Sequence, residues 1–267
     1  MTKIIIMGAT GRMGSRITAL SREYGDLKVV GAVEREGHES IGKDVGLLAG
    51  TGELGIRLSA DLGEVIDKTD VIIDFTSVSS TLKTVKLAAE RKKAMVIGTT
   101  GFSKDEREVV REASSGMPVV LAPNMSVGVN LLLRVLGDVA RVLGDDYDVE
   151  IIEAHHRLKK DAPSGTAVKM AQVIAEALKR NLETVAVYAR QGLIGERTKK
   201  EIGIQTVRAG DIVGEHTVLF GGLGERIEIT HKASSRDTFA RGALKAAQWV
   251  HNKSAGFYDM QDVLGLK

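Results

Sequence analysis

Residues 3–14 read KIIIMGATGRMG, an apolar run followed by three glycines in the spacing G-x-x-G-x-x-G. The apolar run predicts a buried strand, and helical periodicity from Arg12 to Arg22 predicts a helix after the glycines. A second apolar run begins at Leu27 and ends at Glu34, twenty residues after Gly14. Strand, glycine turn, helix, strand and terminal acid in this order are typical of a dinucleotide-binding α/β domain.

The glycine turn and its terminal acid predict how a dinucleotide binds. Glycines allow backbone amides to approach a pyrophosphate at the positive end of the helix. Glu34 can accept hydrogen bonds from both ribose hydroxyls of NAD, and Arg35 can pair with the 2′-phosphate of NADP. The pair therefore predicts that both NADH and NADPH bind. The alternatives are a glycine-rich turn without a ligand and, for Arg35, a solvated surface charge.

Strands and helices continue to alternate through the first half of the chain. Strands are expected at 71–75, 94–98 and 119–122, and helices at 79–91 and 104–115. This alternation predicts a Rossmann-like, doubly wound parallel sheet, in which ligands bind at the carboxyl edge of the strands. Loops at that edge, such as Asp74–Thr76, are candidates for the nicotinamide end. The candidate cofactor-binding residues are Gly8, Ala9, Thr10, Gly11, Arg12, Met13, Glu34, Arg35, Gly98, Thr99, Thr100, Ala122, Pro123, Asn124 and Met125.

The pattern changes near Asn124 and predicts a second domain of the α+β type. Helices are expected at 127–143 and 165–180, and strands at 148–154, 185–190, 203–208, 216–220 and 227–231. Gly221, Gly222 and Gly224 predict a tight turn between the last two strands, in an open mixed or antiparallel sheet. A closing helix at 236–252 would return to the first domain. We therefore expect a dinucleotide-binding domain of residues 1–126 and 237–267, and a substrate-binding and oligomerisation domain of residues 127–236.

Residues 153–167, EAHHRLKKDAPSGTA, gather proton donors ahead of a helix start. An imidazole suits proton transfer near neutral pH, and amides at a helix N-terminus suit a carboxylate. Several structural roles are the alternatives. His155 and His156 are adjacent, so in a strand they point to opposite faces and make a poor metal pair, although either can be an ordinary buried residue. Lys159 and Lys160 can form a solvated turn, and Ser164 is also an ordinary N-cap.

Composition narrows the class of protein. The 267 residues carry a net charge of only +2 and include no cysteine, so neither a nucleic-acid binder nor a disulfide or thiolate metal site is indicated. No apolar run is long enough for a membrane helix, and the chain opens on a strand pattern rather than a signal peptide. We expect a cytoplasmic enzyme that acts on a small molecule, with no nucleic acid or membrane partner.

Together these motifs resemble the 4-hydroxy-tetrahydrodipicolinate reductase (dihydrodipicolinate reductase) family of lysine and diaminopimelate biosynthesis. The resemblance covers nearly the whole chain, and the block 153–167 is its most specific part. The motifs that carry it are Gly8–Gly14, Glu34-Arg35, Asp74–Thr76, Gly98–Gly101, Asn124–Asn130, Glu153–Ala167 and His231–Arg236. One departure is Met125, where the family often has Phe.

The resemblance implies an NAD(P)H-dependent reduction of the unsaturated dipicolinate precursor to tetrahydrodipicolinate. It implies that His155 is the general acid, that Lys159 assists as a proton donor, and that His156, Gly165 and Thr166 bind the dicarboxylate cyclic imine. It also implies a homotetramer, and the alternating run at 216–220 suits an edge or interface strand. The alternatives are a non-catalytic NAD(P)-binding regulator and another two-domain dehydrogenase acting on an amino acid or an aldehyde.

Overall fold

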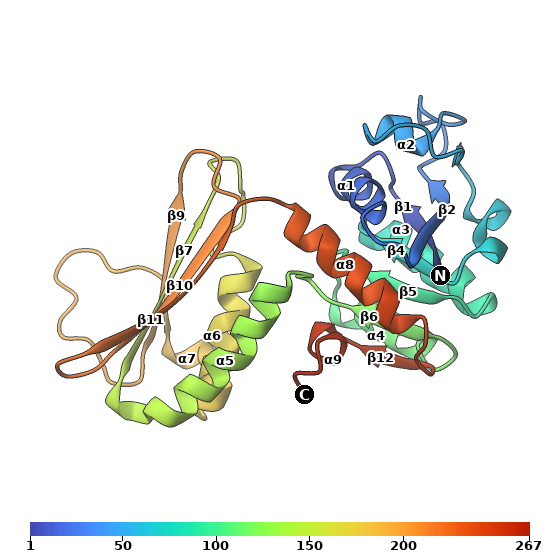
Figure 1. Cartoon of the computed structure of the whole chain (residues 1–267). Coiled ribbons are helices and arrows are strands. Elements are labelled where there is room, and N and C mark those ends of the chain that lie inside the picture. The colour runs from blue at the N-terminus through green and yellow to red at the C-terminus, as the bar shows by residue number, and fades with distance from the viewer. The chain divides into compact units, whose positions relative to one another are not determined.

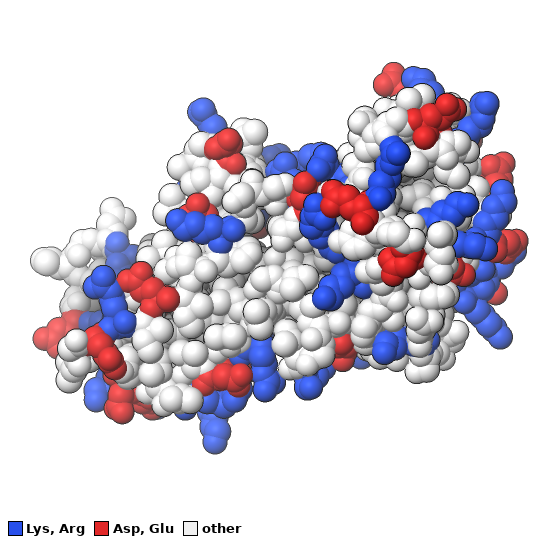
Figure 2. Space-filling model, viewed as in Figure 1, with Lys and Arg blue, Asp and Glu red and all other residues white.

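The computed structural model describes all 267 residues, which form two compact units (Figure 1). Unit 1 consists of Met1–Val127 together with Asp237–Lys267, and unit 2 is the intervening segment Gly128–Arg236. On the face shown in Figure 2, acidic and basic residues are interspersed on both units. No helix of the chain combines the length and the apolar character needed to cross a membrane.

A seven-stranded parallel sheet forms the centre of unit 1. Its central strands are buried on both faces, which explains why they read as continuous apolar runs rather than as alternating patterns. This sheet confirms the predicted Rossmann-like fold class. In spatial order the strands are β12 (Gly256–Tyr258), β6 (Pro118–Leu121), β5 (Ala94–Ile97), β4 (Val71–Asp74), β1 (Thr2–Met7), β2 (Leu27–Val33) and β3 (Leu58–Ser59).

Helices cover both faces of the parallel sheet. On one face α1 (Arg12–Ser21) and α8 (Asp237–Val250) pack over Ile4 and Ile6, and on the other α3 (Val78–Glu90) and α4 (Lys104–Ala113) pack over Ile5 (Figure 1). Successive strand residues point to opposite faces, so one strand serves two hydrophobic cores. The short helices α2 (Val45–Leu48) and α9 (Met260–Val263) complete the unit.

Unit 2 is a five-stranded mixed sheet with helices packed on one face. The strand order is β11 (Arg226–Ala233), β10 (Gly214–Gly221), β7 (Asp148–His155), β9 (Ile202–Arg208) and β8 (Ala186–Val187). Strands β7 and β9 are parallel, whereas β10 is antiparallel to both β7 and β11. The helices are α5 (Val127–Leu143), α6 (Gly165–Ala177) and α7 (Leu182–Val185). Because inward residues of β7 such as Val149 and Ile151 join this core, Glu153 and His155, further along the same strand, face the helices as well.

The strand predicted at 185–190 is present but its predicted bounds are wrong, because only Ala186–Val187 pairs with β9. The segment after Val187 is held in place by side-chain hydrogen bonds instead of backbone hydrogen bonds between strands. Arg190 donates two hydrogen bonds to the Glu150 carboxylate, and Arg197 donates to Glu150, to Asp148 and to the carbonyl of Val149. Such a contact pattern has no period along the sequence, so it cannot be recognised there. The short strands β3 and β12 were also missed, since two or three residues are too few for a pattern.

Candidate active site

The glycine turn of unit 1 leaves backbone donors at the start of α1. Gly11 is the N-cap residue, and no side chain caps the first turn of the helix. The amide of Ala9 donates to the Val33 carbonyl at 3.2 Å, which ties the turn to the end of β2. Uncapped first-turn amides at the carboxyl edge of a parallel sheet fit a dinucleotide pyrophosphate.

Glu34 lies against the same turn. Its carboxylate accepts hydrogen bonds from the Thr10 hydroxyl at 2.6 Å, the Thr10 amide at 3.3 Å and the Arg35 amide at 3.0 Å. Burial raises the pKa of Glu34, but these hydrogen bonds outweigh burial and leave the pKa below its ordinary value. An ionised carboxylate with remaining acceptor capacity beside the glycine turn fits a ribose diol.

His38 also belongs to this region, although the sequence offered no signal for it. Its Nδ1 accepts a hydrogen bond from the Ser40 amide at 3.2 Å, so in the neutral ring Nε2 carries the hydrogen. That nitrogen lies 3.3 Å from the Thr10 hydroxyl oxygen, which itself donates to Glu34. His38, Thr10 and Glu34 therefore form a chain of hydrogen bonds that orients the carboxylate.

The other candidate cofactor residues of unit 1 occupy both exposed and buried positions. Arg12, Arg35 and Thr100 are exposed, whereas Ala9, Thr99 and Ala122 are buried. Met125 is only 1% exposed and packs in the core that includes α8. Its side chain is thus a core residue in this structure, so a contact of Met125 with a cofactor would involve its backbone.

Asp74 ends β4 as a fully buried acid among hydroxyl groups. Its Oδ1 accepts from the amide of Thr76 at 2.9 Å and from the Thr76 hydroxyl at 2.6 Å, and the Thr99 hydroxyl lies 3.5 Å away. Its Oδ2 is buried and has no hydrogen-bond partner. Burial raises the pKa of Asp74 despite these hydrogen bonds. The loops after β4 and β5 are thereby joined through one carboxyl group.

The raised pKa of Asp74 predicts a pH-dependent stability. As the pH rises above about 4, the usual value for Asp, the unfolded chain loses a proton that the folded chain keeps. Stability therefore falls relative to Asp74→Asn until the pH passes the raised folded pKa, and the difference is constant beyond it. Urea denaturation of both proteins between pH 4 and pH 8 measures this difference. A constant difference over the whole range would contradict the assignment.

In unit 2 the block 153–167 links the end of β7 to the start of α6. Ser164 caps α6 by accepting a hydrogen bond from the amide of Ala167 at 3.2 Å, as expected for an N-cap. The Gly165 amide makes no hydrogen bond within the protein, and a Cβ built on Gly165 meets no atom within 4 Å. An open space beside a helix N-terminus suits a carboxylate ligand.

His155 and Lys159 both lie near this helix start. The Nδ1 of His155 is 2.6 Å from the Glu153 carboxylate, and the Lys159 ammonium pairs with both oxygens of Asp161 at 2.8 Å. Burial lowers the pKa of His155, and Glu153 raises it by a smaller amount. His156 follows the strand, is half-buried, and accepts a backbone hydrogen bond from Lys159. The sequence-predicted residues of this block thus converge on one region.

The cluster is completed by three residues that were not predicted as site residues, namely Glu153, Arg208 and His216. Arg208 from β9 donates two hydrogen bonds to Glu153, each 2.8 Å long. His216 from β10 contacts the Ser164 hydroxyl at 3.1 Å, and its ring packs edge-on against His155 at 5.2 Å between centroids. Burial lowers the pKa of His216 to about 4, which keeps this second imidazole neutral at physiological pH. Strand alternation places Glu153 on the same face of β7 as His155. The pairing of β7 with β9 and β10, which brings in Arg208 and His216, cannot be predicted from the sequence.

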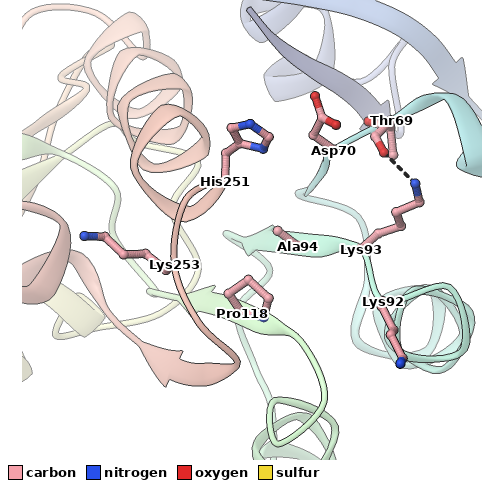
Figure 3. Close-up of a pocket in the computed structure, with 8 residues that line it drawn as sticks. All are labelled: Thr69, Asp70, Lys92, Lys93, Ala94, Pro118, His251 and Lys253. Atoms are coloured by element: carbon pink, nitrogen blue, oxygen red, sulfur yellow. Dashed lines mark hydrogen bonds between the residues drawn. The ribbon is translucent and has the colours of Figure 1, made fainter.

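A cavity of about 270 Å³ lies at the opposite edge of the parallel sheet (Figure 3). Figure 3 shows Lys92 and Lys253 pointing away from it, while Lys93 donates to the Thr69 carbonyl at 2.8 Å. Its charges therefore do not converge on a ligand. It also lies at the amino ends of β4, β5 and β6, whereas ligands of such sheets bind at the carboxyl ends.

The chain is similar to known proteins along nearly its whole length. Models of dihydrodipicolinate reductase match the chain over residues 2–125 for the N-terminus and 128–264 for the C-terminus. The 4-hydroxy-tetrahydrodipicolinate reductases of Geobacter sulfurreducens and Hahella chejuensis are 59% and 58% identical to it, over 100% of both chains in each case.

Solved structures show the same relationship. Dihydrodipicolinate reductase from Paenisporosarcina sp. TG-14, described as dipicolinate-bound, aligns with a TM-score of 0.76 and 25% identity over 98% of each chain. An amine dehydrogenase from Mycobacterium smegmatis aligns with a TM-score of 0.61 and 13% identity over 96% of this chain and 94% of its own, which is a likeness of fold. The resemblance seen in the sequence is confirmed, and the chain belongs to the dihydrodipicolinate reductase family.

Proposed function

We propose that this chain reduces 4-hydroxy-tetrahydrodipicolinate to tetrahydrodipicolinate with NADH or NADPH, as a cytoplasmic enzyme of lysine and diaminopimelate biosynthesis. The observation that carries the proposal is the pairing of His155 with the buried Glu153 next to the N-terminus of α6. A proton donor and a carboxylate-binding helix start lie within one block of the chain, as reduction of a dicarboxylate requires. The full-length identity to named reductases supports the same reaction.

We assign the cofactor to unit 1. The amides at the start of α1 would hold the pyrophosphate, and Glu34 would accept hydrogen bonds from the ribose. The loops that follow β4, β5 and β6, with Gly98, Thr100 and Asn124, would surround the nicotinamide, which supplies a hydride when bound. Asp74 would keep the first two of these loops in register.

We assign the substrate to unit 2. The Gly165 and Thr166 amides, together with the Thr166 hydroxyl, would bind one substrate carboxylate at the start of α6. His156 and Lys159 would contact the remaining polar groups of the ring. His155 would deliver a proton to the ring as the hydride arrives, so that the substrate gains a hydride and a proton and loses water.

The test is a cofactor-oxidation assay with freshly prepared substrate and both cofactors. Oxidation of NADH or NADPH that depends on the substrate supports the proposed reaction. Binding of cofactor without turnover would instead identify a non-catalytic regulator. Turnover only with an amino-acid or aldehyde substrate would identify a different dehydrogenase.

The ribose contacts predict opposite effects of two neighbouring substitutions. Arg35→Ala should weaken NADPH binding more than NADH binding, because only NADPH carries the 2′-phosphate. Glu34→Ala should weaken NADH more, by about tenfold for a lost hydrogen bond to a charged group. Fluorescence titration of both cofactors measures the two dissociation constants. Equal losses of both cofactors in each variant would show that neither side chain recognises the ribose.

We also propose that the chain assembles as a homotetramer through the sheet of unit 2. The run 216–220 lies in β10, which pairs with strands on both sides, so the expectation that it forms an edge strand is wrong. Strand β11 is the edge strand, and its residues are exposed or half-buried. On the sheet face away from the helices, the large apolar residues Ile152 and Val207 are 40% and 43% exposed and are available for a subunit contact. We therefore predict a single species of about four chain masses in sedimentation at micromolar concentration. A monomer under these conditions would refute the proposal.

A further inference from the structure

Glu153 is the most completely satisfied acid of unit 2. None of its surface is exposed, and its two oxygens accept five contacts. Oε1 accepts from the Ser164 amide at 3.0 Å, the Thr206 hydroxyl at 3.3 Å and Arg208 Nη2 at 2.8 Å. Oε2 accepts from Arg208 Nη1 at 2.8 Å and lies 2.6 Å from His155 Nδ1.

These contacts fix the charge of Glu153. The Arg208 guanidinium donates two hydrogen bonds to Glu153, and the Ser164 amide donates a third. Groups that can only donate favour the ionised carboxylate, which can only accept. Burial raises the pKa of Glu153, but the hydrogen bonds from Arg208, His155 and Ser164 outweigh burial and lower the pKa overall. An ionised carboxylate only accepts hydrogen bonds, so the hydrogen between it and His155 belongs to Nδ1.

We propose that Glu153 is a positioning residue, which fixes His155 as the Nδ1–H tautomer and makes Nε2 the atom that gives its proton to the substrate. The inference rests on the proposed reductase function and identifies the reacting atom within it. The protein gives Nε2 no hydrogen-bond partner, whereas Nδ1 is already committed to Glu153. In the protonated ring the Nε2 hydrogen is therefore the one free to leave.

Gly214 keeps the space beside Nε2 open. It lies at the start of β10, whose next residue, Glu215, pairs with Ala154 of β7. A Cβ built on Gly214 would lie 3.1 Å from His155 Nε2, closer than most real contacts of a Cβ. Any side chain at this position would crowd the nitrogen that the proposal assigns to proton transfer.

The charged and titratable groups around His155 come from four strands and one loop. Of the two neighbouring imidazoles, His155 takes up a proton more readily than His216. His216 is buried against the Ser164 hydroxyl and stays neutral. Lys159 and Arg208 oppose a positive ring, and Glu153 is the nearest group that favours it. The complete set is Glu153 on β7, Arg208 on β9, His216 on β10, His231 on β11, and Lys159 with Asp161 in the loop after β7.

The proton balance of the step follows from this assignment. The N–H bond at Nε2 breaks, its electron pair stays on the ring, and a new C–H bond forms on the substrate. The hydride comes from the reduced nicotinamide, so the substrate is reduced and the cofactor oxidised. His155 ends neutral as the Nδ1–H tautomer that Glu153 stabilises, and water returns the proton to Nε2.

The first experiment measures the tautomer in the wild-type chain without substrate. Nitrogen-15 spectra of histidine-labelled protein, assigned with His155→Gln, should show a protonated Nδ1 and an unprotonated Nε2 in the neutral ring. An Nε2–H tautomer would overturn the proposal. This measurement needs no turnover, so its result does not depend on whether the chain is a reductase. The tautomer assignment and the proposed function can therefore be contradicted separately.

The second experiment compares two glutamates of one strand. Glu153→Gln should lower kcat on the order of 100-fold or more, as when an orienting carboxylate is lost from a catalytic histidine. Because the variant also lowers the pKa of His155, its activity should fall at a lower pH than that of the wild type. Glu150→Gln is the matched control, since Glu150 also binds arginine but on the opposite face. An unchanged pH profile in Glu153→Gln would contradict the proposal.

Gly214→Ala provides a test that leaves the buried ion pair intact, should Glu153→Gln fail to fold. The added methyl group crowds Nε2 but not Nδ1. We expect kcat to fall with the tautomer unchanged in the nitrogen-15 spectrum. Normal kcat in Gly214→Ala would show that Nε2 is not the donating atom.

Discussion

His155→Gln is expected to lower kcat by roughly two to four powers of ten, the usual contribution of a general acid. Glutamine keeps a polar group of similar reach next to Glu153 but has no transferable proton at neutral pH. The proton is needed only as the hydride arrives, so the loss falls on kcat, with a smaller effect on KM. Steady-state kinetics with saturating NADH measures both constants.

Two variants of the same block serve as comparisons for His155→Gln. Thr166→Val should chiefly raise KM, by about tenfold to a hundredfold for one hydrogen bond lost to a charged carboxylate. Lys159→Met should resemble the histidine variant if Lys159 donates a proton, and the threonine variant if it only pairs with a carboxylate. The affinity for NADH should survive in all three. A near-normal kcat in His155→Gln would make the block a binding loop.

Gly14→Ala is expected to disrupt both the cofactor site and the stability of unit 1. A Cβ at this position would lie 2.2 Å from the Gly8 carbonyl oxygen and 2.7 Å from Ala9 Cα. Both are backbone atoms, so the turn and α1 must separate. We expect the free energy of unfolding to fall by roughly 3 kcal/mol, the upper end of the range for overpacked cores. The dissociation constant for NADH should rise about 100-fold, the upper value for one lost hydrogen bond between a backbone amide and the charged pyrophosphate.

Gly25→Ala is the matched control for Gly14→Ala. A Cβ on Gly25 meets no atom within 4 Å, so the same chemical change is made without a clash. Thermal unfolding and NADH titration of both variants separate the clash from the general effect of replacing glycine. Wild-type affinity for NADH in Gly14→Ala would show that the close approach of helix and turn is not needed for binding.

The fold and the nucleotide turn could be predicted because their signals are local. Buried parallel strands are apolar runs, and the turn between β1 and α1 needs glycine where the backbones meet. The N-cap at Ser164 is likewise set by neighbouring residues. The burial of the Met125 side chain could not be predicted, because its place in the sequence, next to a carboxyl edge, did not reveal that it packs in the same core as α8.

The second half of the candidate catalytic cluster could not be predicted because it depends on strand pairing. Arg208 and His216 reach the cluster through the register of β9 and β10 with β7, across more than fifty residues of sequence. Period-2 alternation states which face a residue takes, but it does not state which residue of another strand lies opposite. Glu153 was within reach of the sequence, since it stands two positions before His155 in one strand.

Unit 1 consists of two segments of the chain, with unit 2 between them. This arrangement affects the order in which the two units can fold during synthesis. Ribosomes release the N-terminus first, yet the core of unit 1 includes Ala243, Leu244 and Ala247 of α8. Until α8 emerges, only α1 covers Ile4 and Ile6, so the core of unit 2 can be completed before this core of unit 1 is closed. A nascent chain that stops before Asp237 therefore leaves the part of the sheet that α8 covers exposed, and exposed apolar surface of this kind is bound by chaperones and attacked by proteases.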